Sequence, residues 1–138
     1  MKNDTICPPK VKFTNWSTAD FFNRAMKVNT FIRRRKEHYW YMCERNLLAA
    51  LLYYCEGKNI PVNADNVQKH LSAGVRKLRG LFRTLPEKHP GAWYYNLVAD
   101  VTDPVLTSVI AGLKVRMEKI ADSPVALIER FQKELVTV

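Results

Sequence analysis

Residues 37–55 read EHYWYMCERNLLAALLYYC and carry the clearest helical pattern of the chain. Apolar residues recur along this stretch at spacings of three and four, the period of a helix that buries one face. The run from Leu47 to Cys55 has no polar interruption, so this half of the helix is expected to be buried nearly all round. Its charged residues are expected near the ends or on one solvated face, and Gly57 is expected to end it. We therefore predict a central helix here.

Helix-start signals organise the sequence on either side of the central helix. Ser17 or Thr18 can cap a helix that ends near 29–30, and Asn63 can cap a short helix over 64–71. Asp103 followed by Pro104 predicts a helix that runs to about residue 121, because proline suits the first helical position.

Shorter segments fill the rest of the chain. A turn at 72–74 leads to a helix over 75–84, a loop covers 86–91, and residues 93–98 form a short aromatic helix or turn. Ser123 and Pro124 start a last helix, and strand-like pieces are confined to the neighbourhoods of Val11 and Val136. We predict an all-α protein: a tail over 1–14 and a compact single-domain helical bundle of about six to seven helices over 15–138.

Length and composition agree with one globular domain. The chain has 138 residues, of which 47% are hydrophobic and 25% charged. Its longest apolar run is far shorter than the roughly 20 residues that cross a bilayer, and the polar N-terminus does not predict a signal peptide. Three cysteines, an odd number, favour reduced thiols over a disulfide framework and hence a reducing compartment.

Positive charge is concentrated in two segments. The formal net charge is +9, and residues 1–36 hold nine basic and two acidic residues while residues 61–90 hold six and two. Such a distribution indicates one or two positive surfaces, whose natural counterparts are nucleic acid or an acidic protein. A solvated basic face without a partner is the alternative.

The first candidate binding segment lies just before the central helix. Cations at the N-terminus of a helix oppose the macrodipole at about 0.3–1 kcal/mol each, so helix stability alone does not explain four of them. Arginine forks bind phosphates and carboxylates bidentately, which makes this run a candidate contact for DNA or for an acidic protein surface. Its residues are Arg33, Arg34, Arg35 and Lys36. A solvated loop whose charges point away from the helix is the alternative.

The second candidate segment has the outline of a helix-turn-helix, in which the second helix would enter the major groove of DNA. Contact with phosphates alone, and a basic solvated face, are alternatives. The candidate DNA-binding residues of this segment are Lys69, Arg76, Lys77, Arg79 and Arg83.

Catalysis has little support in the sequence. There is no phosphate-cradling glycine loop that precedes a helix, and His38, His70 and His89 lie on different elements without metal-ligand spacing. We expect no catalytic residue, no metal and no cofactor, and therefore a binding protein rather than an enzyme. Aromatic side chains could stack on bases, but Trp40 and Tyr54 are expected in the core, and the stretch 93–95 fits either role.

Three motifs in order resemble one known family. They are YWxxCERNLLxALLxY at 39–54, TADFF at 18–22 followed by Asn29 and Thr30, and SVIAGLxxRM at 108–117. Together they resemble the all-α domain of type IV secretion coupling proteins, the TraG/TraD-like family, over roughly residues 15–122. Cys43 stands where that family usually has alanine, and the basic run at 33–36 replaces a loop that often carries an acidic residue.

The resemblance implies a function. In that family the all-α domain is an insertion in a hexameric ATPase at the inner face of the cell membrane, and it receives the DNA and the relaxosome proteins, the relaxase or an accessory protein. The implied chain is a cytoplasmic substrate-recognition domain for conjugation, without a phosphate-binding loop of its own, beside the ATPase and membrane-anchor portions of a parent. Two alternatives stay open: a free-standing helix-turn-helix DNA-binding protein that uses 63–84, and an adaptor that binds only proteins.

Overall fold

The computed structural model describes residues 11–28 and 37–121, and every regular element within these ranges is an α-helix. The predicted all-α bundle is therefore confirmed. The last predicted helix and the strand-like piece near Val136 lie outside the described residues, and Val11 belongs to no strand. The described helices are α1 (Trp16–Lys27), α2 (Glu37–Gly57), α3 (Ala64–Leu71), α4 (Val75–Arg83), α5 (Pro90–Asn96) and α6 (Asp103–Ala121).

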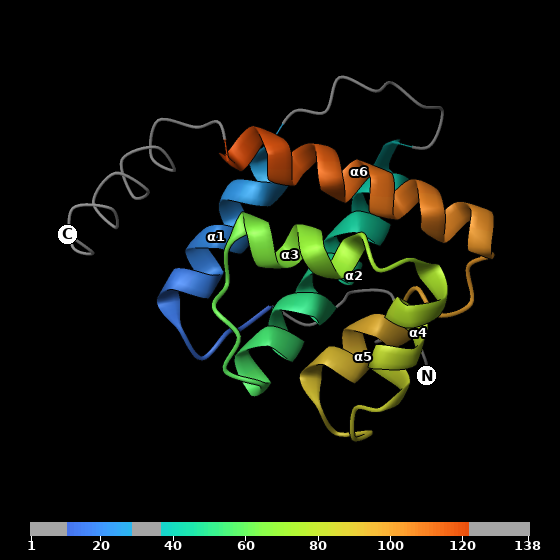
Figure 1. Ribbon diagram of the computed structural model, residues 1–138, viewed down its shortest axis with the longest axis horizontal. Coiled ribbons are helices and arrows are strands. Elements are labelled where there is room, and N and C mark those ends of the chain that lie inside the picture. The colour runs from blue at the N-terminus through green and yellow to red at the C-terminus, as the bar shows by residue number, and fades with distance from the viewer. Residues whose placement is uncertain (1–10, 29–36, 122–138) are drawn as a thin grey trace.

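The bundle is arranged around α2, as the apolar run predicts. All six residues from Leu47 to Leu52 have 0% exposure. Helices α1, α5 and α6 pack against α2, while α3 lies against α6 and α4 against α5 (Figure 1). Because neighbours surround its second half, α2 buries leucines that each contribute about 1.5–3 kcal/mol. Trp40 and Tyr54 pack at the edge of this core.

The end of α2 differs from the prediction in its terminating residue. Gly57 is the last helical residue, and the left-handed position belongs to Asn59, with φ 58°. The N–H of Ile60 donates to the carbonyl of Cys55 at 2.9 Å, and the N–H of Asn59 donates to the carbonyl of Glu56 at 3.2 Å. These two bonds form a Schellman motif, which satisfies carbonyls that the helix end leaves free. Asparagine, like glycine, tolerates the left-handed region.

The two ends of α1 also differ from the prediction. Asn15, not Ser17 or Thr18, is the cap: its side-chain oxygen accepts hydrogen bonds from the backbone N–H and the hydroxyl of Ser17. Thr18 is instead buried at 2% exposure. The helix ends at Lys27 rather than near 29–30, because Val28 is already extended.

The predicted tail is anchored at its inner end. The hydroxyl of Tyr53 accepts from the N–H of Lys12 at 2.8 Å and donates to the carbonyl of Lys12 at 2.6 Å. Phe13 packs against Phe22 and Tyr53, with ring centroids 5.5 and 4.6 Å away. Residues 11–14 therefore belong to the packed domain.

An ion pair is buried where α1, α2 and α6 meet. The Arg116 guanidinium of α6 donates to the Glu44 carboxylate of α2 at 2.7 Å, and both side chains are less than one-tenth exposed. The same guanidinium donates to the carbonyls of Ala25, Met26 and Val28 at the end of α1. The expectation that Glu44 lies near a helix end or on a solvated face is therefore wrong.

Three helix starts lie at or within a few residues of the predicted positions. Asn63 caps α3 as predicted, since its side chain accepts from the N–H of Asn66. Helix α5 begins at Pro90, inside the predicted loop, with the His89 ring accepting from the N–H of Gly91. Helix α6 includes Asp103, so Thr102 lies in the cap position.

Candidate nucleic-acid interface

Helix α4 has one apolar face and one positive face. Leu78 and Phe82 are buried in the core at 1% and 2% exposure. Arg76, Lys77 and Arg83 are exposed on the opposite side, and α4 contains no acidic residue. The outer side of α4 is therefore uniformly positive. We call the surface formed by Arg76, Lys77 and Arg83 the α4 basic face.

The cations of this face are not neutralised by neighbours in the described ranges. Arg76, Lys77 and Arg83 have no ion-pair or hydrogen-bond partner for their side chains there. Arg76 and Lys77 lie in the first turn of α4, where positive charge opposes the helix macrodipole. The cap residue Gly74 has φ 101° and supplies no side-chain hydrogen bond, and the first turn holds no acid. An anion at this end would be favourable to both the helix and the cations.

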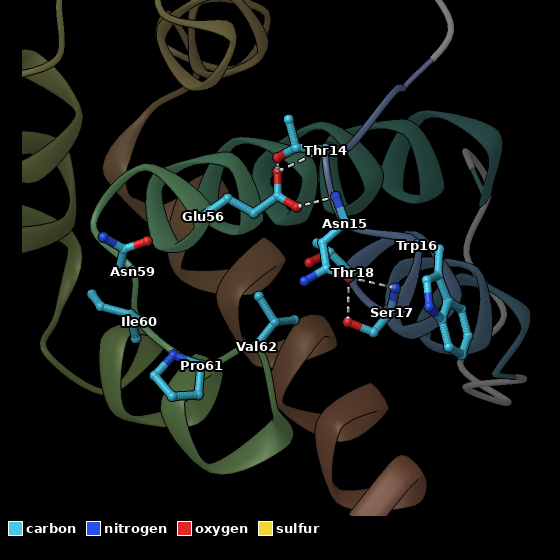
Figure 2. A pocket seen from close by; sticks show the side chains of 10 residues that line it. All are labelled: Thr14, Asn15, Trp16, Ser17, Thr18, Glu56, Asn59, Ile60, Pro61 and Val62. Atoms are coloured by element: carbon cyan, nitrogen blue, oxygen red, sulfur yellow. Dashed lines mark hydrogen bonds between the residues drawn. The ribbon is translucent and has the colours of Figure 1, made fainter.

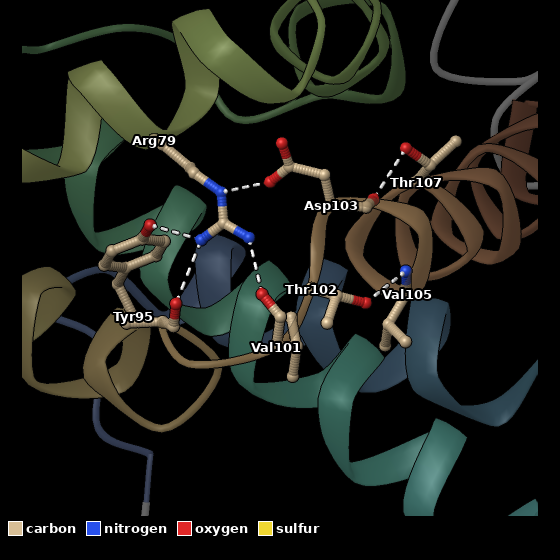
Figure 3. A network of polar contacts seen from close by, with 8 residues as sticks. Arg79, Tyr95, Val101, Thr102, Asp103, Val105 and Thr107 are labelled. Carbon is tan, nitrogen blue, oxygen red and sulfur yellow. Dashed lines mark hydrogen bonds and ion pairs between the residues drawn. The ribbon is translucent and has the colours of Figure 1, made fainter.

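Arg79 points into the protein instead (Figure 3). Its guanidinium donates to the Asp103 carboxylate at 3.1 Å, to the Tyr95 hydroxyl at 3.2 Å, and to the carbonyls of Ala99 and Val101 at 3.0 and 2.7 Å. Its side chain is 12% exposed. Burial acts to lower the pKa of Arg79, but its interactions with Tyr95 and Asp103 outweigh burial and raise it. Because these acceptors occupy the guanidinium, we leave Arg79 out of the α4 basic face.

The remaining predicted DNA-binding residues are placed as follows. Lys69 is exposed on α3, and the three-residue turn 72–74 joins α3 to α4 as the helix-turn-helix outline predicts. Helices α3 and α4 contact each other, and Gly74 supplies the positive φ that the turn requires. The run Arg33, Arg34, Arg35 and Lys36 lies outside the described residues.

The aromatic residues after α4 separate into two groups. Tyr95 stacks on Phe82 with centroids 4.7 Å apart, and Tyr94 stacks on Tyr53 at 5.7 Å. Both tyrosines are buried, whereas Trp93 is 42% exposed. Of this ambiguous stretch, Tyr94 and Tyr95 belong to the core and only Trp93 faces solvent.

A cavity that the sequence does not indicate lies between the start of α1 and the connector after α2 (Figure 2). It has a volume of about 720 Å³. The Glu56 carboxylate accepts from the N–H and hydroxyl of Thr14 and from the N–H of Asn15, at 2.9–3.2 Å. Trp16, at the rim, is 79% exposed. Because the partners of Glu56 are more than 40 positions away, only the folded chain brings them together. Glu56 holds the entry to α1 in place.

Among residues 11–28 and 37–121, no three His, Cys, Asp or Glu side chains gather in a way that could hold a metal ion. None of the helices described in these ranges combines the length and the apolar composition needed to span a membrane.

Comparison with known proteins finds no relative. No family model, no curated protein and no solved structure matches this chain.

Proposed function

We propose that this chain binds DNA through the α4 basic face, as the substrate-recognition domain of a conjugative coupling protein. The observation that carries the proposal is the set of three exposed cations, Arg76, Lys77 and Arg83, that have no acidic partner among the described residues. Lys69 on the preceding helix adds a fourth exposed cation.

The electrostatics of α4 favour a negatively charged ligand. Two of the cations lie at the positive end of the helix, where they reduce helix stability by about 0.3–1 kcal/mol each. A phosphate bound there would reverse that effect, since it interacts favourably with the helix end and with arginine forks. Internal packing explains Arg79, which has its acceptors inside the protein, but it does not explain the three exposed cations.

The composition of the face favours nucleic acid over an acidic protein. Protein interfaces are depleted of charge at their centres and enriched in aromatic residues. The outward positions of α4 hold Arg76, Lys77, Gly80 and Arg83, with no large apolar side chain among them. A surface of this kind matches phosphate contacts, which depend on charge and are sequence-independent.

The family resemblance extends the proposal to the biological partners. As a coupling-protein domain, the chain would contact the DNA and the relaxosome proteins in the cytoplasm, beside an ATPase that assembles as a hexamer at the inner face of the membrane. Under this proposal α4 contacts phosphates and affinity changes little with sequence. A free-standing helix-turn-helix protein would instead prefer particular sequences, and a protein-only adaptor would not bind DNA.

Fluorescence anisotropy tests the proposal. Labelled single- and double-stranded DNA are titrated with the protein at several salt concentrations between about 50 and 200 mM, where phosphate contacts are most visible. The triple variant Arg76→Gln, Lys77→Gln, Arg83→Gln should bind more weakly. Its salt dependence, the slope of log K against log salt, should also be shallower by about 0.7–0.9 for each phosphate that the variant no longer neutralises.

A charge-matched control separates a site from general attraction. Lys27, Lys58 and Lys88 are exposed and lie on other parts of the chain. Replacing these three with Gln lowers the net charge from +9 to +6, as the first variant does. We expect the control to keep most of the affinity. Equal binding by both variants, or no binding by the unaltered chain at low salt, would refute the proposal, and the second result would favour a protein partner.

A further inference from the structure

Gly80 occupies an unfavourable place in α4. Glycine is among the least favourable residues in a helix interior, because ordering its backbone has a large entropic cost. Such a glycine is usually explained by a positive φ, a bend or a close internal contact. Gly80 is in regular helix within α4, and the residue with positive φ in this region is Gly74.

Internal packing does not explain Gly80. Apart from its two chain neighbours and the adjacent backbone of α4 itself, a Cβ atom built on this residue would meet no heavy atom of the described chain within 4 Å. Gly112 provides the contrast, since a Cβ there would lie 2.7 Å from the carboxylate carbon of Glu44. Alanine at position 80 would therefore fit without a clash and would favour the helix.

The cations of the α4 basic face surround Gly80. Arg76 and Lys77 precede it by four and three positions, and Arg83 follows it by three. On a helix, residues three and four apart are neighbours, with Cβ atoms about 5–6 Å from one another. Gly80 is thus a bare stretch of backbone with a cation on each side along the helix surface.

We infer that Gly80 is the point at which the DNA backbone lies directly against α4. This inference rests on the DNA-binding function proposed above. Because no side chain stands between the strand and the helix, a phosphate can come close enough for the flanking guanidinium and ammonium groups to donate to it. Coulomb attraction weakens with distance, so a side chain at position 80 would hold the phosphates farther from all three cations.

The test measures stability and affinity in the same variants. Gly80→Ala should raise the melting temperature by about 2–4 °C, as expected for a gain in helix propensity in a chain of this size. The same variant should bind DNA about fivefold more weakly, roughly the effect of removing one hydrogen bond. Gly80→Gln should weaken binding further. Because the Ala variant gains stability while its affinity falls, unfolding cannot account for the weaker binding.

Ala111→Gln is the matched control, since Ala111 is exposed on a different helix, α6. It should leave DNA affinity unchanged. Unaltered affinity in both Gly80 variants, with weaker binding in the triple variant at Arg76, Lys77 and Arg83, would overturn the role of Gly80 and keep the proposed function. Absence of DNA binding in the unaltered chain would overturn both.

Discussion

Replacing Arg116 with Met should strongly destabilise the protein, although the two side chains are similar in size. The guanidinium connects three helices: it donates to Glu44 on α2 at 2.7 Å and to three carbonyls at the end of α1 at 2.9–3.2 Å. Methionine keeps part of the apolar stem but removes the charge and every donor. The Glu44 carboxylate, 7% exposed, would then be buried without its cation.

The magnitude can be worked out in two ways. Removing one partner of a buried ion pair costs about 3–5 kcal/mol, because the remaining charge is left uncompensated. Separately, losing the three hydrogen bonds to carbonyls costs about 0.5–1.5 kcal/mol each, and leaving the carboxylate without a partner adds a further cost. Both values amount to several kcal/mol, a large part of the free energy of unfolding of a typical domain, which is roughly 5–15 kcal/mol. We expect Arg116→Met to lower the free energy of unfolding by about 3–5 kcal/mol.

Urea unfolding followed by far-ultraviolet circular dichroism measures this change. A double-mutant cycle with Glu44→Gln isolates the pair, because the double variant has neither charge of the pair. We expect the double variant to be more stable than the sum of the single changes predicts, by about 1–3 kcal/mol. A cost below about 1 kcal/mol for Arg116→Met, or simple additivity in the cycle, would show that Arg116 does not stabilise the buried Glu44 carboxylate.

Gly112 offers a third member for the same cycle. A Cβ at this position would lie against the Glu44 carboxylate, 2.7 Å from its carbon and closer still to one oxygen. Elsewhere a flexible carboxylate could move aside, but Arg116 holds this one in place. Gly112→Ala should therefore be clearly destabilising in the unaltered chain and much less so in the Arg116→Met background. Equal costs in the two backgrounds would show that Arg116 does not fix Glu44.

Three further predictions concern single residues. Asn59→Ala should lower the free energy of unfolding by about 1 kcal/mol, because φ is 58° there, while Asn59→Gly should be neutral; equal urea midpoints for the two would contradict this. Burial raises the pKa of the Cys55 thiol from 9.0 to about 11, so the native state keeps a proton that the unfolded chain loses, and stability should fall as pH rises from about 9 to 11. Urea titrations at several pH values should show that the free energy of unfolding falls less steeply with pH in Cys55→Ala, by at most about 1.4 kcal/mol per pH unit. Identical pH dependence in the two proteins would contradict this prediction. Arg79→Met should cost about 2–4 kcal/mol because it removes four hydrogen bonds, and a cost under about 0.5 kcal/mol in the same assay would show that they contribute little.

Local signals were enough to predict most of the helices. The uninterrupted apolar run of α2 predicted its burial. The start of α3 was predicted correctly from Asn63, because a helix cap depends only on residues within one turn of it. The misplaced ends have local causes as well. At the end of α2 the sequence offers Gly57 and Asn59 for the left-handed position, and hydrogen bonding to Cys55 and Glu56 selected Asn59.

The charged residues show where prediction from sequence stops. Arg116 falls on the inward face of α6 by its spacing from Leu113 and Ile120, so the helical period alone could have indicated its burial. Glu44 has the same kind of spacing on α2, three positions before Leu47 and four before Leu48, but its pairing with Arg116 could not be found in this way, because the two residues are 72 positions apart. Only the packing of α1 and α6 against α2 removes that carboxylate from solvent.

Internal acceptors determine which arginines of α4 are free to bind a partner. Arg79 follows the buried Leu78 and precedes the buried Phe82 by three positions, so it lies at the edge of the inward face, where the segment 99–103 supplies acceptors. Arg76 and Arg83 lie farther from the core on the same helix and find no acceptor in the described chain. All three arginines contribute equally to the net charge, but Arg79 fixes the position of α4, and Arg76 and Arg83 are left to contact a ligand. An arginine therefore indicates a nucleic-acid surface only after the internal acceptors within its reach have been assigned.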